Sequence, residues 1–331
     1  MAIKISATQL STFQECPYKY YLAYIAKVKP PRWIKFLFGA IVHQTIARFY
    51  SLDERNRLKR VEKGSTELFP QSKESAINIW HWMWSEALKG EKANPKIIHN
   101  PGPIRYDPVI DPKEQAEKLR RLGASMIGKY WEDNHHAPFP LAVEFRFEVP
   151  APGRSDVTLI GSIDQIREIE GKLWIIDLKT SWEDYGVEDS RIQYAVHNET
   201  QFTLYSWAFR MMWGKEEAGI IRYPLGFKKC PITGNKIDKK AIITPRDIEN
   251  YVNLATLIEY FLFILNKGIF PKFFGRHCQF CDYLDFCAKN KITTTPVPTS
   301  QLFKAVDPNK IRAQLEEATQ SLPRIKRPRL L

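Results

Sequence analysis

The stretch LIGSIDQIREIEGKLWIIDLKT, residues 159–180, decides the fold of this chain. Two apolar runs in it, ending at Ile169 and Leu178, are separated by a turn at Gly171, which predicts two antiparallel strands. Residues 141–149 alternate in the same way and predict a third strand, with four apolar side chains on one face: Val143, Phe145, Phe147 and Val149. We therefore expect a three-stranded antiparallel meander, with strands at 141–149, 157–169 and 173–178.

Two acids and a lysine stand at the ends of the second and third predicted strands. Asp177 and Lys179 are two residues apart and therefore point to the same side of their strand, while Asp164 lies on the paired neighbour. Two carboxylates a few ångströms apart repel and need a cation, and a hard divalent ion suits oxygen ligands. Such an ion polarises a phosphoryl oxygen and activates water, and Lys179 could then stabilise the transition state. An Asp-x-Lys tripeptide alone is more often a surface salt bridge, so both interpretations stay open here.

Helical patterns flank the meander on both sides. Upstream, we expect helices at 6–26, 35–58, 72–90 and 112–134, with a proline-rich loop over 94–112. Downstream, the pattern predicts a helix at 192–213, a strand at 219–227 and an amphipathic helix at 245–268. This order predicts an α/β chain in which helices flank a mixed sheet.

The chain of 331 residues carries 49 Lys+Arg against 37 Asp+Glu, a formal charge of +12. No uncharged apolar run is long enough for a transmembrane helix, and the N-terminus lacks the apolar core of a secretory signal. We therefore expect an intracellular, cytoplasmic protein with no membrane partner. The basic surplus favours a nucleic-acid partner, although a charge kept for solubility would explain the same number. Residues 291–331 predict a basic, flexible tail.

The acids and the lysine carry a family resemblance. Asp164, followed by Asp177-Leu178-Lys179 on the next strand, resembles the signature of the PD-(D/E)XK nuclease superfamily. The chain is similar above all to its RecB-like branch, which has a Gly-x-x-x-His motif on an upstream helix and a Gln-x-x-x-Tyr motif on the helix after the lysine. Gly39–His43 and Gln201–Tyr205 match these two motifs. The resemblance implies a restriction-endonuclease-like fold.

The resemblance also implies a role for each matched residue. Mg²⁺ or Mn²⁺ would be held by His43, Asp164, Asp177 and the backbone carbonyl of Leu178. Lys179 would activate water, and Gln201 and Tyr205 would position the lysine and the DNA strand. The implied catalytic residues are Asp164, Asp177, Lys179, Gln201 and Tyr205. The chain departs from the family pattern at Asp177, where many relatives have Glu, and at Ala47, where relatives often have an acid.

Four of the five cysteines form a pattern of their own. Cys16 precedes Pro17 near the N-terminus, and the other three follow a C-x2-C-x5-C spacing. In an intracellular protein such a set favours metal over disulfides, and the spacing leaves zinc and an iron–sulfur cluster open. Iron–sulfur members of the RecB-like branch, such as the AddB nuclease domain and the CRISPR-associated exonucleases, have the same arrangement. The resemblance therefore implies a [4Fe–4S] cluster held by Cys16, Cys278, Cys281 and Cys287.

By resemblance, residues 1–290 form one nuclease domain, with a helical part at 1–135, a catalytic core at 136–245, and a C-terminal helix and cysteine segment at 246–290. The implied function is a divalent-metal-dependent DNA exonuclease, with endonuclease activity also compatible, that hydrolyses phosphodiester bonds in single-stranded DNA or at DNA ends. Compatible partners are a helicase or recombination protein and further copies of the chain. The alternative is a non-catalytic, cluster-bearing DNA-binding or scaffold subunit of a recombination, repair or CRISPR-adaptation complex.

Overall fold

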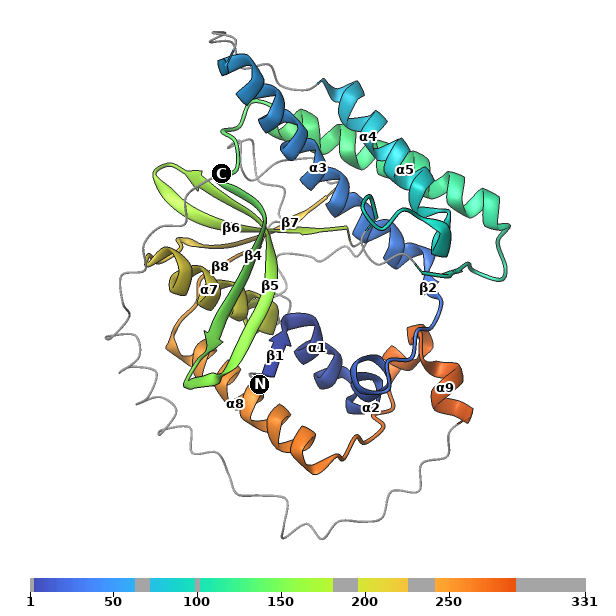
Figure 1. Cartoon of the computed structure of the whole chain (residues 1–331), viewed down its shortest axis with the longest axis vertical. Helices are drawn as coiled ribbons and strands as arrows, with labels where there is room; N and C mark the ends of the chain where they lie inside the picture. Colours follow the sequence, from blue (N-terminus) through green and yellow to red (C-terminus); the bar gives the residue numbers. More distant parts are fainter. Residues whose placement is uncertain (1–2, 63–71, 99–101, 181–195, 226–241, 290–331) are drawn as a thin grey trace.

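A six-stranded mixed sheet forms the centre of the structure (Figure 1). The computed structural model describes residues 3–62, 72–98, 102–180, 196–225 and 242–289. The tail 291–331, Cys230 and the predicted element ends at 192–195 and 226–227 lie outside these residues. The strands are β1 (Ile3–Ser6), β4 (Ala142–Ala151), β5 (Arg154–Ile169), β6 (Lys172–Lys179), β7 (Gly219–Pro224) and β8 (Ile242–Thr244).

The predicted meander is confirmed, because β4 pairs antiparallel with β5 and β5 antiparallel with β6. Two edge strands escaped prediction: β1 runs parallel to β5, and β8 runs antiparallel to β7. Each has only three or four residues, too few for a period of two to stand out. The segment 94–112 was predicted as a loop, but its strand β3 (Ile104–Arg105) pairs with β2 (Arg32–Trp33) in a small parallel sheet.

Helices cover both faces of the sheet (Figure 1). Alternate residues of the central strands point to opposite faces: Ile175 packs into one core and its neighbour Ile176 into the other. The core on the Ile176 face lies under α3 (Ile34–Glu62), α4 (Lys73–Ala87) and α5 (Pro112–Asn134). The core on the Ile175 face lies against α1 (Ala7–Glu15), α7 (Thr200–Trp213) and α8 (Ile248–Lys267).

The prediction that Val143 and Phe145 lie on the same face of β4 is wrong. Val143 was expected beside Phe145, yet Val143 packs into the α3–α5 core and Phe145 into the opposite one. The reason is Glu144, whose φ of 48° lies in the left-handed region and turns the strand between its two neighbours. Oε2 of Glu144 accepts a hydrogen bond from Ser162 Oγ at 2.9 Å.

The predicted helix over 6–26 is also interrupted. Ser6 caps α1 in a reciprocal capping box with Gln9, as expected of a serine at this position. The helix ends at Cys16, whose extended backbone has φ −164° and ψ 110°. A residue that precedes proline avoids helical geometry, so Pro17 explains the break. The chain continues as α2 (Pro17–Tyr20) and a π-helical turn (Tyr21–Ile25), and the C-terminal segment contains a 3-10 turn (Arg276–Phe280) and α9 (Leu284–Lys289).

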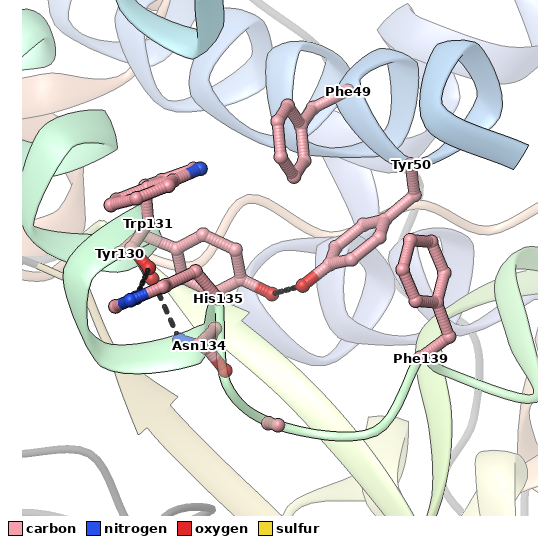
Figure 2. A pocket seen from close by; sticks show the side chains of 8 residues that line it. Phe49, Tyr50, Tyr130, Trp131, Asn134, His135 and Phe139 are labelled. Atoms are coloured by element: carbon pink, nitrogen blue, oxygen red, sulfur yellow. Dashed lines mark hydrogen bonds between the residues drawn. The ribbon is translucent and has the colours of Figure 1, made fainter. Parts of the chain in front are cut away.

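A buried arginine ties the helices to the sheet. Arg167 of β5 is 2% exposed, and its guanidinium donates hydrogen bonds to Gln165 Oε1 at 2.8 Å and to the hydroxyl of Tyr50 at 2.7 Å. Tyr50 and Tyr130, from α3 and α5, are themselves joined at 2.9 Å. Figure 2 shows this pair in a small aromatic pocket beside Phe139. Because every bond involves a buried partner, the network fixes the α3–α5 layer over β5.

Helix α8 is long and apolar enough, by length and composition alone, to cross a membrane. Half of its apolar window is buried, and its side chains Ile258 and Phe261 belong to the core with α1 and α7. This burial is what a core helix requires.

Candidate active site

The site forms where β5 changes its neighbour. Along one edge, β5 pairs with β1 as far as Ile160, and its pairing with β6 covers only 165–169. Neither of these pairings covers 161–164. Asp164 lies at the end of that gap, where its Oδ2 accepts a hydrogen bond from the backbone N–H of Leu178 at 2.7 Å. The Asp164 carboxylate thus takes the place of a backbone carbonyl as the hydrogen-bond acceptor, and it links β5 to β6 where their backbone pairing ends.

Strand β6 brings the second acid and the lysine. Asp177 is 1% exposed, and its Oδ2 lies 3.0 Å from Nζ of Lys179. Both point to the same side, as their spacing of two predicts. Buried inside the sheet, Asp177 has no bulk water to stabilise its charge.

Helix α3 places His43 next to Asp164. Nδ1 of His43 lies 3.4 Å from Oδ2 of Asp164. This approach depends on Gly39, one helical turn earlier, because a Cβ atom there would come within 2.8 Å of Thr180 Oγ1. The glycine of the Gly-x-x-x-His motif therefore lets α3 lie close against the end of β6.

Helix α7 delivers the glutamine and the tyrosine. Oε1 of Gln201 lies 3.1 Å from Lys179 Nζ, and Nε2 of Gln201 donates to the hydroxyl of Tyr205 at 2.6 Å. The i,i+4 spacing on one helix face makes this contact possible. Asp177, Lys179, Gln201 and Tyr205 thus form one continuous chain of polar contacts.

Burial raises the pKa of Asp177 to about 7, and the neighbouring carboxylate of Asp164 contributes, while Lys179 opposes the shift. Burial alone would lower the pKa of Lys179, but the carboxylates of Asp177 and Glu199 outweigh it, so the pKa is raised. The lysine therefore carries its charge at neutral pH.

The first acid and the histidine influence each other. Burial favours the neutral imidazole of His43, but the Asp164 carboxylate outweighs this and raises its pKa. Burial likewise favours neutral Asp164, yet His43 and the Leu178 N–H stabilise the carboxylate and lower its pKa. Burial and the two carboxylates raise the pKa of Tyr205 well above its ordinary value, so its hydroxyl keeps its proton.

These residues suit a hard divalent ion by their chemistry. Oδ2 of Asp177 is buried and has the Lys179 ammonium 3.0 Å away, and a carboxylate oxygen is the kind of ligand that a hard divalent ion prefers. As the side chains stand, no group of three or more His, Cys, Asp or Glu in the described part is arranged to hold a metal ion. The assignment of His43, Asp164, Asp177 and the Leu178 carbonyl as ligands stays a prediction.

Two further acids border the site and escaped prediction. Glu199 places Oε1 3.9 Å from Lys179 Nζ, and Glu144 acts on the pKa of both His43 and Tyr205. The only signal for Glu199 was its place two residues before Gln201. Glu144 sits in an apolar alternation as a solvent-face residue would, and its left-handed backbone has no signature in the sequence.

The four patterned cysteines line one hollow, although Cys16 is more than 260 residues from the others in sequence. The hollow has a volume of about 80 Å³. The backbone N–H of Phe273 points to Cys16 Sγ at 3.5 Å, and the N–H of Tyr18 donates to the Pro271 carbonyl at 3.1 Å. The N-terminal turn and the C-terminal segment therefore meet at the cysteines.

Comparison with known proteins gives a family match over nearly the whole chain. The model of the PD-(D/E)XK nuclease superfamily matches residues 4–288. Among solved structures, 14 chains match, including the crystal structure of SSO0001, at 16% identity over 86% of this chain and 96% of that one, with a TM-score of 0.29. At these values, the likeness to SSO0001 carries no argument about function. No curated protein matches the chain.

Proposed function

The chain belongs to the PD-(D/E)XK nuclease superfamily, and from this premise we propose that it is a divalent-metal-dependent DNA exonuclease of the RecB-like iron–sulfur branch. Membership makes it a metal-dependent nuclease and a phosphodiester hydrolase, and its mixed sheet between helices fits the restriction-endonuclease-like fold. The finer proposal concerns its action on single-stranded DNA or DNA ends.

One observation carries the proposal: three distant segments bring their matched residues to one point. His43 comes from α3, Asp164 and Asp177 from two adjacent strands, and Gln201 from α7. A surface salt bridge would need only Asp177 and Lys179. It would not require Asp177 to be buried to 1% exposure.

In this mechanism each side chain has a definite task. Mg²⁺ or Mn²⁺, when held by Asp164, Asp177, His43 and the Leu178 carbonyl, would neutralise phosphoryl charge and lower the pKa of a water. Lys179 supplies a fixed positive charge that orients the attacking water and stabilises the developing charge.

Gln201 positions this lysine. Its amide N–H group is engaged by Tyr205, so its oxygen is directed to Lys179 Nζ. Because the Tyr205 hydroxyl stays protonated, it remains available to donate to a phosphate oxygen of the DNA strand.

A nuclease assay with three substrates tests the proposal. End-labelled single-stranded, blunt duplex and circular DNA are incubated with titrated Mg²⁺ or Mn²⁺ and with EDTA. We expect degradation of linear but not circular DNA, and no degradation in EDTA. Equal cleavage of circles would contradict an exonuclease.

Variants locate the active site in the same assay. Asp177→Ala and Lys179→Ala should each lower the rate by about a hundredfold or more, the usual effect of removing a transition-state contact. Asp156→Ala and Lys4→Ala replace exposed residues on the same sheet and serve as matched controls. Wild-type rates in both active-site variants would show that the assignment is wrong.

We further propose that the cysteine hollow holds a [4Fe–4S] cluster. The support for a metal group is that Cys16 lines the same hollow as the other three cysteines. Four thiolates suit zinc as well as an iron–sulfur cluster, and the family resemblance favours the cluster. The proposed role is to link the N-terminal turn to the C-terminal segment.

The colour and metal content of anaerobically purified protein test this cluster. We expect a brown protein with iron and acid-labile sulfide, both lost in Cys281→Ser and kept in Cys230→Ser, which changes the cysteine outside the pattern. A colourless, zinc-loaded wild-type protein would refute it.

DNA is the partner that this family membership supports. We propose a cytoplasmic protein that works beside a helicase or recombination protein, or as several copies of itself. The alternative of a non-catalytic DNA-binding or scaffold subunit predicts the same DNA affinity with no metal-dependent cleavage. The presence of Asp164, Asp177 and Lys179 in one site favours the enzyme.

A further inference from the structure

An exposed group of aromatic and basic side chains lies where β2, the start of α3 and the cysteine segment meet. We define the aromatic–cation platform as Trp33, Lys35, Phe36, Arg105 and Phe280. Figure 1 shows β2 and α9 on the same side of the molecule, and the contacts below join them. Phe36 is 49% and Phe280 55% exposed, so two phenyl rings face solvent within one patch.

Cations are interleaved with these rings. Lys35 Nζ lies 4.3 Å from the centre of the Phe280 ring and 5.6 Å from that of Phe36. The guanidinium of Arg105 lies 4.4 Å from the Trp33 ring, which the pairing of β2 with β3 places opposite Arg105. Solvent-exposed rings held next to cations are the combination that binds single-stranded nucleic acid, through stacking and phosphate contacts.

The charge of the platform is only partly neutralised by neighbouring carboxylates. Among the described residues, Lys35 forms no ion pair, and Arg105 has one long contact of 3.9 Å with the exposed Asp285. Asp282 lies within electrostatic reach of both, and of Arg32 and Lys19 as well. Glu15 pairs with Lys19, so these four cations stand against three carboxylates, Asp282, Asp285 and Glu15, and the net charge here is one positive.

The platform and the candidate active site both have a residue on one face of α3. Phe36 and His43 are seven residues apart, so they share one helix face two turns apart, at a rise of about 10.5 Å. Between them this face carries only Gly39 and Ala40, both small and partly exposed. The exposed ring of Phe36 and the imidazole of His43 therefore belong to the same side of α3.

We propose that the aromatic–cation platform binds a single-stranded segment of DNA and guides it along α3 to the candidate active site. Bases stack on Phe36 and Phe280, while Lys35 and Arg105 contact phosphates. Duplex DNA cannot use the rings in this way, because its bases are already stacked. The inference rests on the proposed nuclease function for the choice of DNA as the ligand.

Fluorescence anisotropy in EDTA tests the platform without cleavage. The full-length protein is titrated into a labelled oligodeoxythymidine and into an abasic strand of the same length. Phe36→Ala/Phe280→Ala should raise the Kd for the base-bearing strand about tenfold or more, and that for the abasic strand less than twofold. Phe36→Ala alone, which lies away from the cysteines, should show a smaller loss of the same kind.

The matched control is Trp82→Ala, which removes another exposed ring with an arginine, Arg48, stacked 4.7 Å away. It should bind both strands as the wild type does. An unchanged Kd in the double variant, or an equal loss for both strands, would overturn the proposal and leave this face to a protein partner. Failure of the nuclease proposal is seen separately, as absent cleavage with Mg²⁺ by a protein whose binding still depends on the platform.

Discussion

Asp177→Asn should make the metal-free protein more stable above pH 7, although it removes the proposed activity. Burial of Asp177 and the nearby Asp164 raise the pKa of Asp177 in the folded state from 3.8 to about 7. The folded protein then holds the proton more tightly than the unfolded chain does. The contribution of Asp177 to stability is therefore greatest below about pH 4, falls as the pH rises, and levels off above about pH 7.

The size of this effect follows from the two pKa values. A difference of about three units corresponds to a loss on the order of 4 kcal/mol between pH 4 and pH 7. Asparagine mimics the protonated carboxyl and does not titrate, so the variant escapes that loss. Its advantage in Tm should widen between pH 5 and pH 8, by about 2 °C for each kcal/mol.

The assay is thermal unfolding followed by circular dichroism in EDTA, at intervals from pH 5 to pH 8. The matched control is Asp156→Asn. Asp156 is exposed, and its hydrogen bonds from Arg154 lower its pKa to about 2, so it stays ionised throughout this range. Its Tm curve should run parallel to that of the wild type. Parallel curves for wild type and Asp177→Asn would refute the reasoning, because Asp177 would then carry the same charge at pH 5 and pH 8.

Added Mg²⁺ should reverse the pH trend in the wild type. The ion needs ionised carboxylates, so protons compete with it, and it stabilises the folded state by mass action. We expect Mg²⁺ to raise the Tm of the wild type more at pH 8 than at pH 5.5, and to have little effect on Asp177→Asn. An equal rise in both proteins would place the ion elsewhere.

Two further predictions concern the layer of α3, α4 and α5. Tyr50→Phe leaves the buried Arg167 without one of its acceptors and should lower the free energy of unfolding by about 1.5–3 kcal/mol, measured by urea denaturation; an unchanged midpoint would mean that water replaces the hydroxyl. Gly123→Ala would place a Cβ atom 2.0 Å from the buried Trp80 ring, so overpacking of about 1–3 kcal/mol should exceed the roughly 1 kcal/mol gained in helix propensity. Gly128→Ala on the same helix meets mainly the flexible end of a lysine, so it is the control, and equal costs for both would contradict the packing argument.

The predicted elements that proved right are those with long, regular patterns. The meander, α5 and the core helices α7 and α8 each bury a face whose period is visible in the residue order. The short strands β1, β3 and β8 were missed, and two further errors depend on single backbone positions. Glu144 reverses the face of β4 through a left-handed φ, and Cys16 interrupts the first helix in front of a proline. The spacing of apolar residues contains no information about the backbone conformation of one such residue.

The candidate site divides in the same way. The spacing of two between Asp177 and Lys179, and the place of Asp164 on the neighbouring strand, could be read from the residues, whereas Gln201 and Tyr205 were assigned through the family resemblance. Glu199 could not be assigned in this way, because its contact with Lys179 exists only once the start of α7 packs beside the end of β6. The signature residues were found by their family pattern, whereas their neighbours acquire a role only through packing.

The sequence by itself determined the meander, the helical flanks, the acid–lysine signature and the four-cysteine pattern, because each is encoded in residue type and short spacing. The tertiary structure alone decided how they combine. The backbone pairing of β5 with β6 ends before Asp164, so that the Asp164 carboxylate accepts the hydrogen bond of the Leu178 N–H. Gly39 packs against Thr180, which places His43 of the same helix next to Asp164. The tertiary structure also aligns Phe36 with the site along α3. Such contacts join residues that are far apart in the chain, and their free energy depends on distance and burial, which no local pattern contains.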